Sequence, residues 1–369
     1  SSSVNLPIGI ALLPIVFLVS LLSINVFIYG DDSLNGTNQF ILILSGLFGA
    51  SLGFIYKVSY KKILTSISNS VKSVTGALLI LLFVGALAGT WMISGIIPAM
   101  VYYGLKLLDP NIFLPACIVI CSIISVATGS SWTTSATVGI ALVGIGKALG
   151  IPAGMVGGAV IAGAYFGDKL SPLSDTTNLA AAVTKVDLFK HIKYLTYTTI
   201  PSISITLIVF IILGFLQVSD GSTDNTYLLD AINEKFNISL VLFIVPILVL
   251  IMIIKKTPPL IALVIGTLVG AIFCIIFQPQ IIAELSNGSS SKLVNTYVVI
   301  MDTITGQVSI ETNNELLNDL FSTGGMLGMM NTIFLVIGTM VFGGVMDAIG
   351  ALKTISETLL SWADTSFKL

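Results

Sequence analysis

The chain has 369 residues, of which 55% are hydrophobic and only 9% are charged, and its formal net charge at pH 7 is −2. A soluble domain typically carries about 25% charged residues, so this composition excludes a surface that faces water over most of its area. The 16 Lys and Arg positions are all lysine, which leaves no arginine fork for a carboxylate and no basic stripe for nucleic acid.

Apolar runs long enough to cross a bilayer, about 20 residues each, occur along the whole chain. The clear ones are residues 6–28, 40–56, 195–216, 238–254 and 260–277. Two longer runs, 76–108 and 331–360, contain glycines, and each predicts a tilted helix or a helix followed by an interfacial segment. We therefore expect an all-α polytopic membrane protein with lipid as its main solvent.

The loops between these runs alternate in charge. Residues 57–72 and 185–193 are rich in lysine, whereas 30–38 and 220–237 are acidic. By the positive-inside rule the lysine loops are cytoplasmic, which places the N-terminus inside. The longest polar stretch, 278–322, then falls outside and is expected to be a loop with an amphipathic helix near residues 316–321.

The stretch 112–184 is apolar but interrupted twice, which predicts several half-length helices joined by non-helical breaks. The first interruption, residues 128–137, reads TGSSWTTSAT. Gly129 lets the backbone leave the helix, and the hydroxyls can satisfy the freed backbone groups. Freed carbonyls and hydroxyls together suit a small hard cation, although the same residues also occur in ordinary close packing of membrane helices.

The second interruption, residues 167–178, reads GDKLSPLSDTTN. Pro172 should end the helix before it. Asp168 and Asp175 are carboxylates between apolar runs, where ionisable groups are rare and usually functional. Two structural alternatives stay open, because Asp168 with Lys169 could form a surface turn pair and Asp175 could cap the next helix.

Asp347 and Asn331 are secondary candidates within the last long apolar run. Asp347 fits a proton or cation site, and it fits equally well the exposed end of a helix.

Short similarities recur in the same order along the chain. Residues 13–19 resemble 245–251, and Gly89 with Gly95 resembles Gly344 with Gly350. The charge of the flanking loops predicts that the two copies run in opposite directions, as in many transporters. We therefore assign residues 1–237 to a first repeat and 238–369 to a second, inverted repeat that lacks its C-terminal part.

At these residues the chain resembles the NhaC-type sodium/proton antiporter family. The segments that carry the resemblance are 128–134 with Gly139, 167–180, 187–189 with His191, and 324–344. The resemblance implies cation exchange across a bacterial plasma membrane, and some members are sodium-coupled exchangers of carboxylates such as malate and lactate. It also implies inverted repeats with broken helices and re-entrant segments.

The leading hypothesis is Na⁺/H⁺ antiport with no cofactor, in which Asp175 and Asp168 exchange a proton for Na⁺. Neutral oxygens would come from residues of the two interruptions: Ser131, Thr133, Thr134, Thr176 and Asn178. The expected partners are the lipid bilayer and small cations, with a homodimer left open. The alternative is Na⁺- or H⁺-coupled antiport of a small organic anion.

An enzyme is the less favoured class. The His-Glu-x-x-His pattern of a metalloprotease is absent, and the single histidine, His191, lies in a lysine-rich loop rather than in an apolar run. The charge rings or repeated filter loops of a channel are also absent from the sequence.

Overall fold

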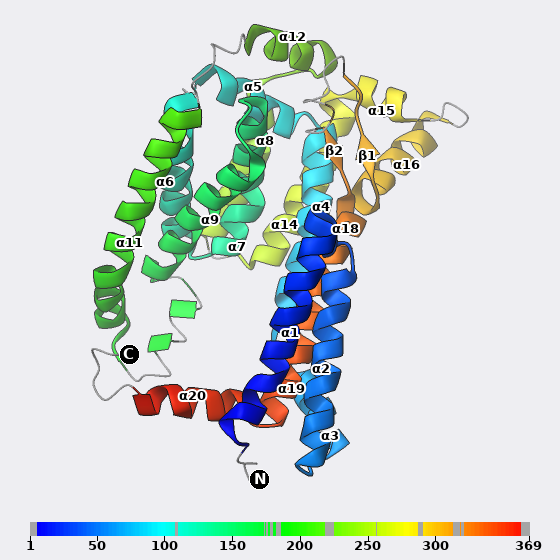
Figure 1. Ribbon diagram of the computed structural model, residues 1–369. Helices are drawn as coiled ribbons and strands as arrows, with labels where there is room; N and C mark the ends of the chain where they lie inside the picture. Colours follow the sequence, from blue (N-terminus) through cyan, green and yellow to red (C-terminus); the bar gives the residue numbers. More distant parts are fainter. Residues whose placement is uncertain are drawn as a thin grey trace. The chain divides into compact units, whose positions relative to one another are not determined.

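The computed structural model describes residues 6–107, 110–172, 174, 176–177, 180–181, 186–217, 225–255, 257–286, 291–312, 318 and 321–362. The chain forms two compact units, one of residues 1–81 with 329–369 and one of residues 82–328. Helices make up most of both units (Figure 1).

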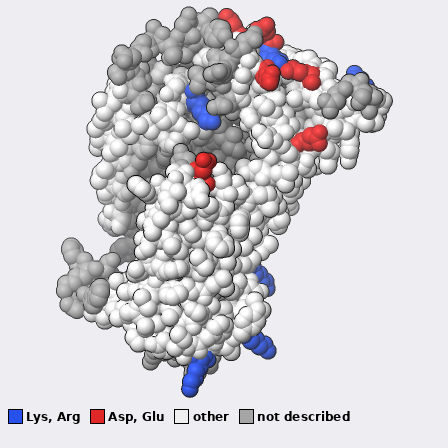
Figure 2. Space-filling model, turned by 45° about the vertical axis from the view of Figure 1, so that its right-hand side comes forward, with Lys and Arg blue, Asp and Glu red and all other residues white. Residues whose placement is uncertain are grey.

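Seven helices in the described part of the chain are long and apolar enough to cross a membrane. They are Ile8–Tyr29, Thr37–Ile55, Thr75–Ile93, Pro110–Ala127, Leu188–Leu216, Pro259–Phe277 and Met330–Ala348. Charged side chains are sparse on the face of the molecule drawn in Figure 2, as expected where lipid is the solvent. The structure thus confirms an all-α polytopic membrane protein.

The first unit is built around helix α19. Its elements are α1 (Ile8–Tyr29), the 3₁₀ turn η1 (Gly30–Leu34), α2 (Thr37–Ile55), α3 (Tyr60–Ser73), the start of α4 (Thr75–Ile93), α19 (Met330–Ala348) and α20 (Ala351–Trp362). Gly46, Gly49 and Gly53 line the face of α2 that packs on α19 and on Ile349 just beyond it. On another side of α19, a Cβ at Gly344 would lie 2.7 Å from the Ile67 Cα of α3. Small residues therefore set the close spacing of these helices.

The second unit begins within α4 and holds the remaining elements. They are α5 (Ile96–Leu107), α6 (Pro110–Thr128), α7 (Ser131–Thr134), the π-helical turn η2 (Ser135–Gly139), α8 (Ile140–Ala148), α9 (Ala153–Leu170), α11 (Leu188–Gln217), α12 (Asn225–Lys235), the 3₁₀ turn η3 (Leu240–Phe243), α13 (Ile244–Ile254), α14 (Pro259–Phe277), α15 (Pro279–Leu285), α16 (Lys292–Thr305), β1 (Val308–Ser309), β2 (Ser322–Thr323) and α18 (Gly325–Gly328).

Helix α4 takes the same place in the second unit as α19 does in the first. Gly266 and Gly270 line the face of α14 that packs on α4, and the Trp91 indole N–H donates to the Gly266 carbonyl at 3.1 Å. A Cβ at Gly89 of α4 would lie 2.5 Å from the Thr303 carbonyl oxygen of α16. Helix α4, from the predicted first repeat, thus packs against α14 and α16 of the predicted second repeat. Helix α19, from the second, packs in turn against α2 and α3 of the first. The repeat boundaries themselves stay a prediction.

The two long apolar runs each end in a glycine with a left-handed backbone. Gly95 has φ +80° and separates α4 from α5, and Gly350 has φ +82° and separates α19 from α20. Each run is therefore a span-length helix followed by a second, shorter helix. This agrees with the expectation of a helix followed by a further segment. That the shorter helices lie at the membrane interface stays a prediction.

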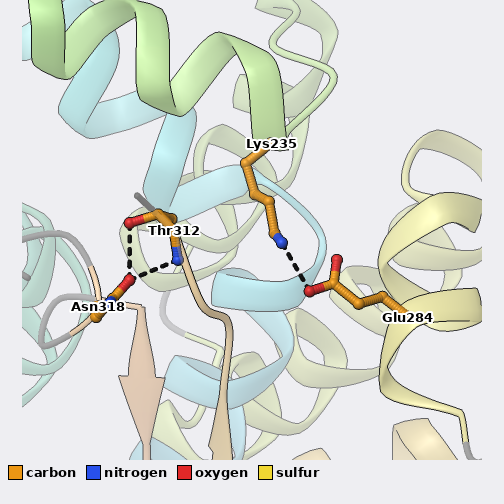
Figure 3. Close-up of polar contacts among 4 residues, drawn as sticks. All are labelled: Lys235, Glu284, Thr312 and Asn318. Carbon is orange, nitrogen blue, oxygen red and sulfur yellow. Dashed lines mark hydrogen bonds and ion pairs between the residues drawn. The ribbon is translucent and has the colours of Figure 1, made fainter. Parts of the chain in front are cut away.

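Polar contacts join the segments at one end of the second unit (Figure 3). Lys235 at the end of α12 forms an ion pair of 2.6 Å with Glu284 of α15. The Asn318 side-chain oxygen accepts from both the backbone N–H and the hydroxyl of Thr312. Below them, strands β1 and β2 form an antiparallel hairpin that the sequence did not predict. Most of the amphipathic helix expected over residues 316–321 lies outside the described residues.

Two predictions about the helices need correction in part. The predicted span 238–254 is a 3₁₀ turn followed by only 11 α-helical residues, and together with the end of α12 it forms a pair bent by 85°. The expectation of half-length helices in the interrupted region fails for α6, which has 19 residues, and for α9, which has 18, but it holds for α8, which has nine. The two breaks follow the last residues of α6 and α9, so these two helices keep their full length.

Candidate functional site

The first predicted break is present at Gly129. Helix α6 ends at Thr128, Gly129 takes φ +70°, and helical structure resumes at Ser131. Only glycine adopts this backbone without strain, which explains its place in the motif. The new helix is itself irregular, since residues Ser135–Gly139 form a π-helical turn before α8. Such turns are rare and often lie at functional sites.

The second predicted break follows Leu170, the last residue of α9. The Ser171 hydroxyl donates to the Val126 carbonyl at 2.7 Å, which ties the end of α9 to α6. The Thr177 hydroxyl contacts the carbonyls of Asp168 at 3.4 Å and Lys169 at 3.2 Å. These carbonyls belong to the last turn of α9, where the regular helical bonding pattern ends, and the Asp168 carbonyl also accepts from the Ser171 N–H at 3.2 Å. The chain after Pro172 therefore folds back onto the end of the helix.

Glycines hold α9 against α6 and so fix the position of Asp168. A Cβ at Gly167 would lie 2.5 Å from the Ser122 carbonyl oxygen and 2.6 Å from the Ser125 Cβ. The Ser125 hydroxyl also donates to the Ala164 carbonyl at 2.5 Å. The two backbones can approach this closely only because no side chain stands between them.

This packing brings the two interruptions together. Asp168 of α9 is 9% exposed, and the Ser131 hydroxyl, 4% exposed, donates to its Oδ2 at 3.2 Å. The two residues are 37 positions apart in the sequence. A nearly buried carboxylate thus lies at the point where one helix begins and another ends.

Both breaks contain further hydroxyl side chains. Thr134 and Thr137 are buried, and the Thr134 hydroxyl donates to the Ser130 carbonyl at 2.9 Å. Ser174 is fully buried and its hydroxyl lies 2.9 Å from that of Thr176, which is exposed.

The structure describes only part of the predicted site. Asp168, Ser131, Thr134 and Thr176 are described, and Asp168 and Ser131 are in contact. Asp175 and Asn178 lie outside the described residues, as does the side chain of Thr133. The predicted Na⁺ ligation by this set stays a prediction.

The two secondary candidates lie at opposite ends of α19. Asp347 is exposed in its last turn, where its Oδ2 accepts from the Ser66 hydroxyl at 3.0 Å. This placement fits the helix-end alternative for Asp347. Asn331 is exposed in the first turn, and its side chain donates to Asn35 Oδ1 at 3.3 Å.

Sequence reasoning missed three hydroxyl residues that shape the second break. All three are buried. The hydroxyls of Ser171 and Thr177 bond to carbonyls of α6 and α9, and the Ser174 hydroxyl accepts from the Thr177 N–H within the break. All three belong to the second interruption, so the density of hydroxyls there was a usable signal. The π-helical turn had no comparable signal in the sequence.

The possible ligand atoms at this site are all oxygens. In the part of the chain that the structure describes, no group of three His, Cys, Asp or Glu side chains comes together to bind a transition metal. One carboxylate with hydroxyl and carbonyl oxygens suits instead a hard monovalent cation or a proton. Such a site can hold either one, because protonation removes the charge that attracts the cation.

Comparisons with known proteins agree with this chemistry. The family model described as "Na+/H+ antiporter family" matches residues 163–369. The chain is 39% identical to the malate-2H⁺/Na⁺-lactate antiporter of Bacillus subtilis, over 93% of this chain and 69% of that protein. It is 35% identical to the Na⁺/H⁺ antiporter NhaC of Alkalihalophilus pseudofirmus, over 86% of this chain and 66% of that protein.

A third relative is the arginine/ornithine antiporter ArcD of Halobacterium salinarum, 32% identical over 97% of this chain and 70% of that protein. The chain thus spans about two thirds of the length of these relatives. No solved structure matches the chain. From the family model and these relatives, the chain belongs to the Na⁺/H⁺ antiporter family of membrane transporters.

Proposed function

We propose that this transporter exchanges Na⁺ for H⁺ and that Asp168 is the carboxylate that carries them in turn. The observation that supports this most directly is the buried contact between the Asp168 carboxylate and the Ser131 hydroxyl at the meeting point of two helix breaks. Ionised groups in apolar surroundings are costly, so a buried carboxylate needs a cation, a proton or several donors. Among described residues, the side chain of Asp168 has one hydrogen-bond donor, Ser131.

Exchange follows from competition for one charge. The ionised Asp168 attracts Na⁺, whose remaining ligands would be the oxygens of Ser131 and nearby backbone carbonyls. Once Asp168 is protonated it is neutral and holds Na⁺ weakly. A carrier that crosses the membrane with either ion, but not both, must then exchange them. Asp175, Thr133, Thr134, Thr176 and Asn178 are proposed as further members of the site on the strength of the sequence alone.

The location that we propose is the plasma membrane of a bacterium, with the N-terminus on the cytoplasmic side. The lysine-rich loops support this orientation. Two of the relatives come from bacteria, which supports the membrane. Native mass spectrometry of the full-length protein tests whether it assembles as a homodimer.

The test uses the full-length protein in proteoliposomes that contain a pH-sensitive dye. Addition of Na⁺ outside should drive protons out of vesicles of the unaltered protein, and Asp168→Asn should reduce this flux to the level of empty vesicles. Asp302→Asn is the matched control, because Asp302 is an exposed carboxylate on α16 and should leave the flux unchanged. Normal Na⁺-driven proton flux in Asp168→Asn would remove Asp168 from the mechanism.

The second candidate function is antiport of an organic anion coupled to Na⁺ or H⁺. The 39% identical relative named as a malate and lactate antiporter favours it. Counterflow of labelled lactate or malate in the same vesicles separates this function from simple cation exchange.

A further inference from the structure

We propose that the groove between α9 and α11 binds a small hydroxycarboxylate through Lys169. This inference rests on the proposed function, since it adds an anion site to the carrier that moves Na⁺. The groove has a volume of about 320 Å³, enough for a molecule of a few heavy atoms. Its polar lining comes from both helices: Tyr165 and Lys169 on α9, and Thr198, Thr199, Ser202 and Thr206 on α11.

The hydroxyl residues of α11 form one continuous face. Positions 198, 199, 202 and 206 are spaced by one, three and four residues, so all four point to the same side of the helix. Most of the remaining surface of α11 is apolar and exposed, including Ile205, Ile208 and Phe215. The polar side chains therefore gather on the side that faces α9, where an apolar helix–helix contact would not need them.

The groove offers both donors and acceptors. In the described part of the chain, the Lys169 ammonium and the hydroxyls of Tyr165 and Ser202 have no hydrogen-bond partner, and all three can donate to a carboxylate.

The threonine hydroxyls have the opposite role. Those of Thr198 and Thr199 donate to the Leu195 carbonyl, and that of Thr206 donates to the Ser202 carbonyl. Their oxygens keep free lone pairs, which can accept from a hydroxyl of the ligand.

The charge of the groove favours an anion. Among the residues that the structure describes, Lys169 is the single charged residue lining the groove, and no Asp or Glu lines it. The single ammonium of Lys169 can pair with one carboxylate group, and the chain has no arginine to bind a second one. The neutral hydroxyls of the groove can bind the rest of the ligand. A monocarboxylate with a hydroxyl group, such as lactate, therefore fits better than an inorganic cation or a second amine.

Lys169 directly follows Asp168, and the two side chains point to different sides of α9. Asp168 is buried against Ser131 of α7, whereas Lys169 is exposed in the groove with α11. Because they share one helical turn, any movement of α9 carries both groups together. Na⁺ on Asp168 would also cancel the negative charge next to the bound carboxylate. Anion affinity should therefore rise with Na⁺ concentration.

The experiment measures uptake of radiolabelled lactate, driven by a Na⁺ gradient, into phosphatidylcholine vesicles with the full-length protein. This zwitterionic lipid excludes competition from anionic headgroups. We expect saturable uptake that Lys169→Gln lowers at least tenfold and Lys169→Arg largely restores. Ser202→Ala should raise the lactate concentration for half-maximal uptake. Lys190→Gln is the matched control, since it removes an exposed lysine from the first turn of α11 and should change nothing.

The readouts separate this inference from the proposed function. Undiminished lactate uptake in a folded Lys169→Gln variant would overturn the site, and so would normal Na⁺-driven proton flux without any saturable lactate uptake. Saturable, Lys169-dependent lactate uptake without Na⁺-dependent proton movement would support the groove while contradicting Na⁺/H⁺ exchange.

Discussion

Replacing Gly167 by alanine should separate Asp168 from Ser131 without touching either residue. The new Cβ would lie 2.5 Å from the Ser122 carbonyl oxygen, whereas ordinary contact begins at 3.4 Å. The obstacle is backbone, which cannot rotate away, so α9 must move from α6 by about 0.9 Å, the difference between these two distances. Asp168 is the next residue along α9 and moves with it.

The displacement is large compared with the contact that it disturbs. The Ser131–Asp168 hydrogen bond is 3.2 Å long, and a shift of about 0.9 Å along it gives about 4.1 Å, beyond hydrogen-bond range. Overpacking of this kind costs roughly 1–3 kcal/mol of stability. The loss of the aligned hydroxyl should lower Na⁺-driven proton flux by at least about tenfold, which corresponds to about 1.4 kcal/mol.

The assay is proton flux in proteoliposomes, paired with the unfolding temperature of the purified variant. Gly157→Ala is the matched control, because it adds the same methyl group to the same helix with nothing within 4 Å. That control should keep its flux and gain up to about 1 kcal/mol from better helix propensity. Equal flux in the two alanine variants would refute the view that close α6–α9 packing positions the carboxylate.

Three further outcomes follow from the same geometry. Ser131→Ala should weaken apparent Na⁺ affinity by about tenfold, as expected for the loss of one hydrogen bond to a charged group, and Na⁺ titration of the flux measures this. Lowering the pH should raise the Na⁺ concentration for half-maximal flux by up to about tenfold per pH unit, because one proton displaces one Na⁺; a pH-independent value would contradict a shared site. Gly95→Ala should destabilise the protein by more than Gly150→Ala, since both glycines have positive φ but only Gly95 lies against the Gln278 side chain, and thermal unfolding of both variants provides the comparison.

The sequence predicted the two helix breaks because glycine and proline have strong local effects. Gly129 allows a left-handed backbone and Pro172 cannot continue a helix, so neither prediction needed tertiary information. The span-length helices followed for a similar reason, since bilayer thickness sets the length of an apolar run.

The bend after α12 and the lengths of α6 and α9 could not be predicted from such local effects. Residues 238–254 have the composition of a span, yet they bend with α12, because hydropathy measures preference for lipid and carries no information about direction. The lengths of α6 and α9 were underestimated for a related reason. A break at a helix end and a break in mid-helix look alike in a sequence.

The site itself was predicted as a set of residues and not as an arrangement. Asp168 and Ser131 were both chosen for their residue type and surroundings, but their contact spans 37 residues and depends on how Gly167 packs against α6. No local pattern encodes such a pairing. The density of hydroxyls in the second interruption pointed to Ser171, Ser174 and Thr177 as a group, but the hydrogen bonds by which each one holds the turn follow only from the coordinates.

The π-helical turn at Ser135–Gly139 is a place near Asp168 where the helix can gain or lose one residue. A π turn contains one residue more than the α turn it replaces, and each residue of an α-helix rotates the chain by about 100°. Loss of one residue there would leave α8 in its packing while turning Ser131 to another side of its axis, away from Asp168. Relatives that differ by one residue in this turn could therefore aim different side chains at the same carboxylate.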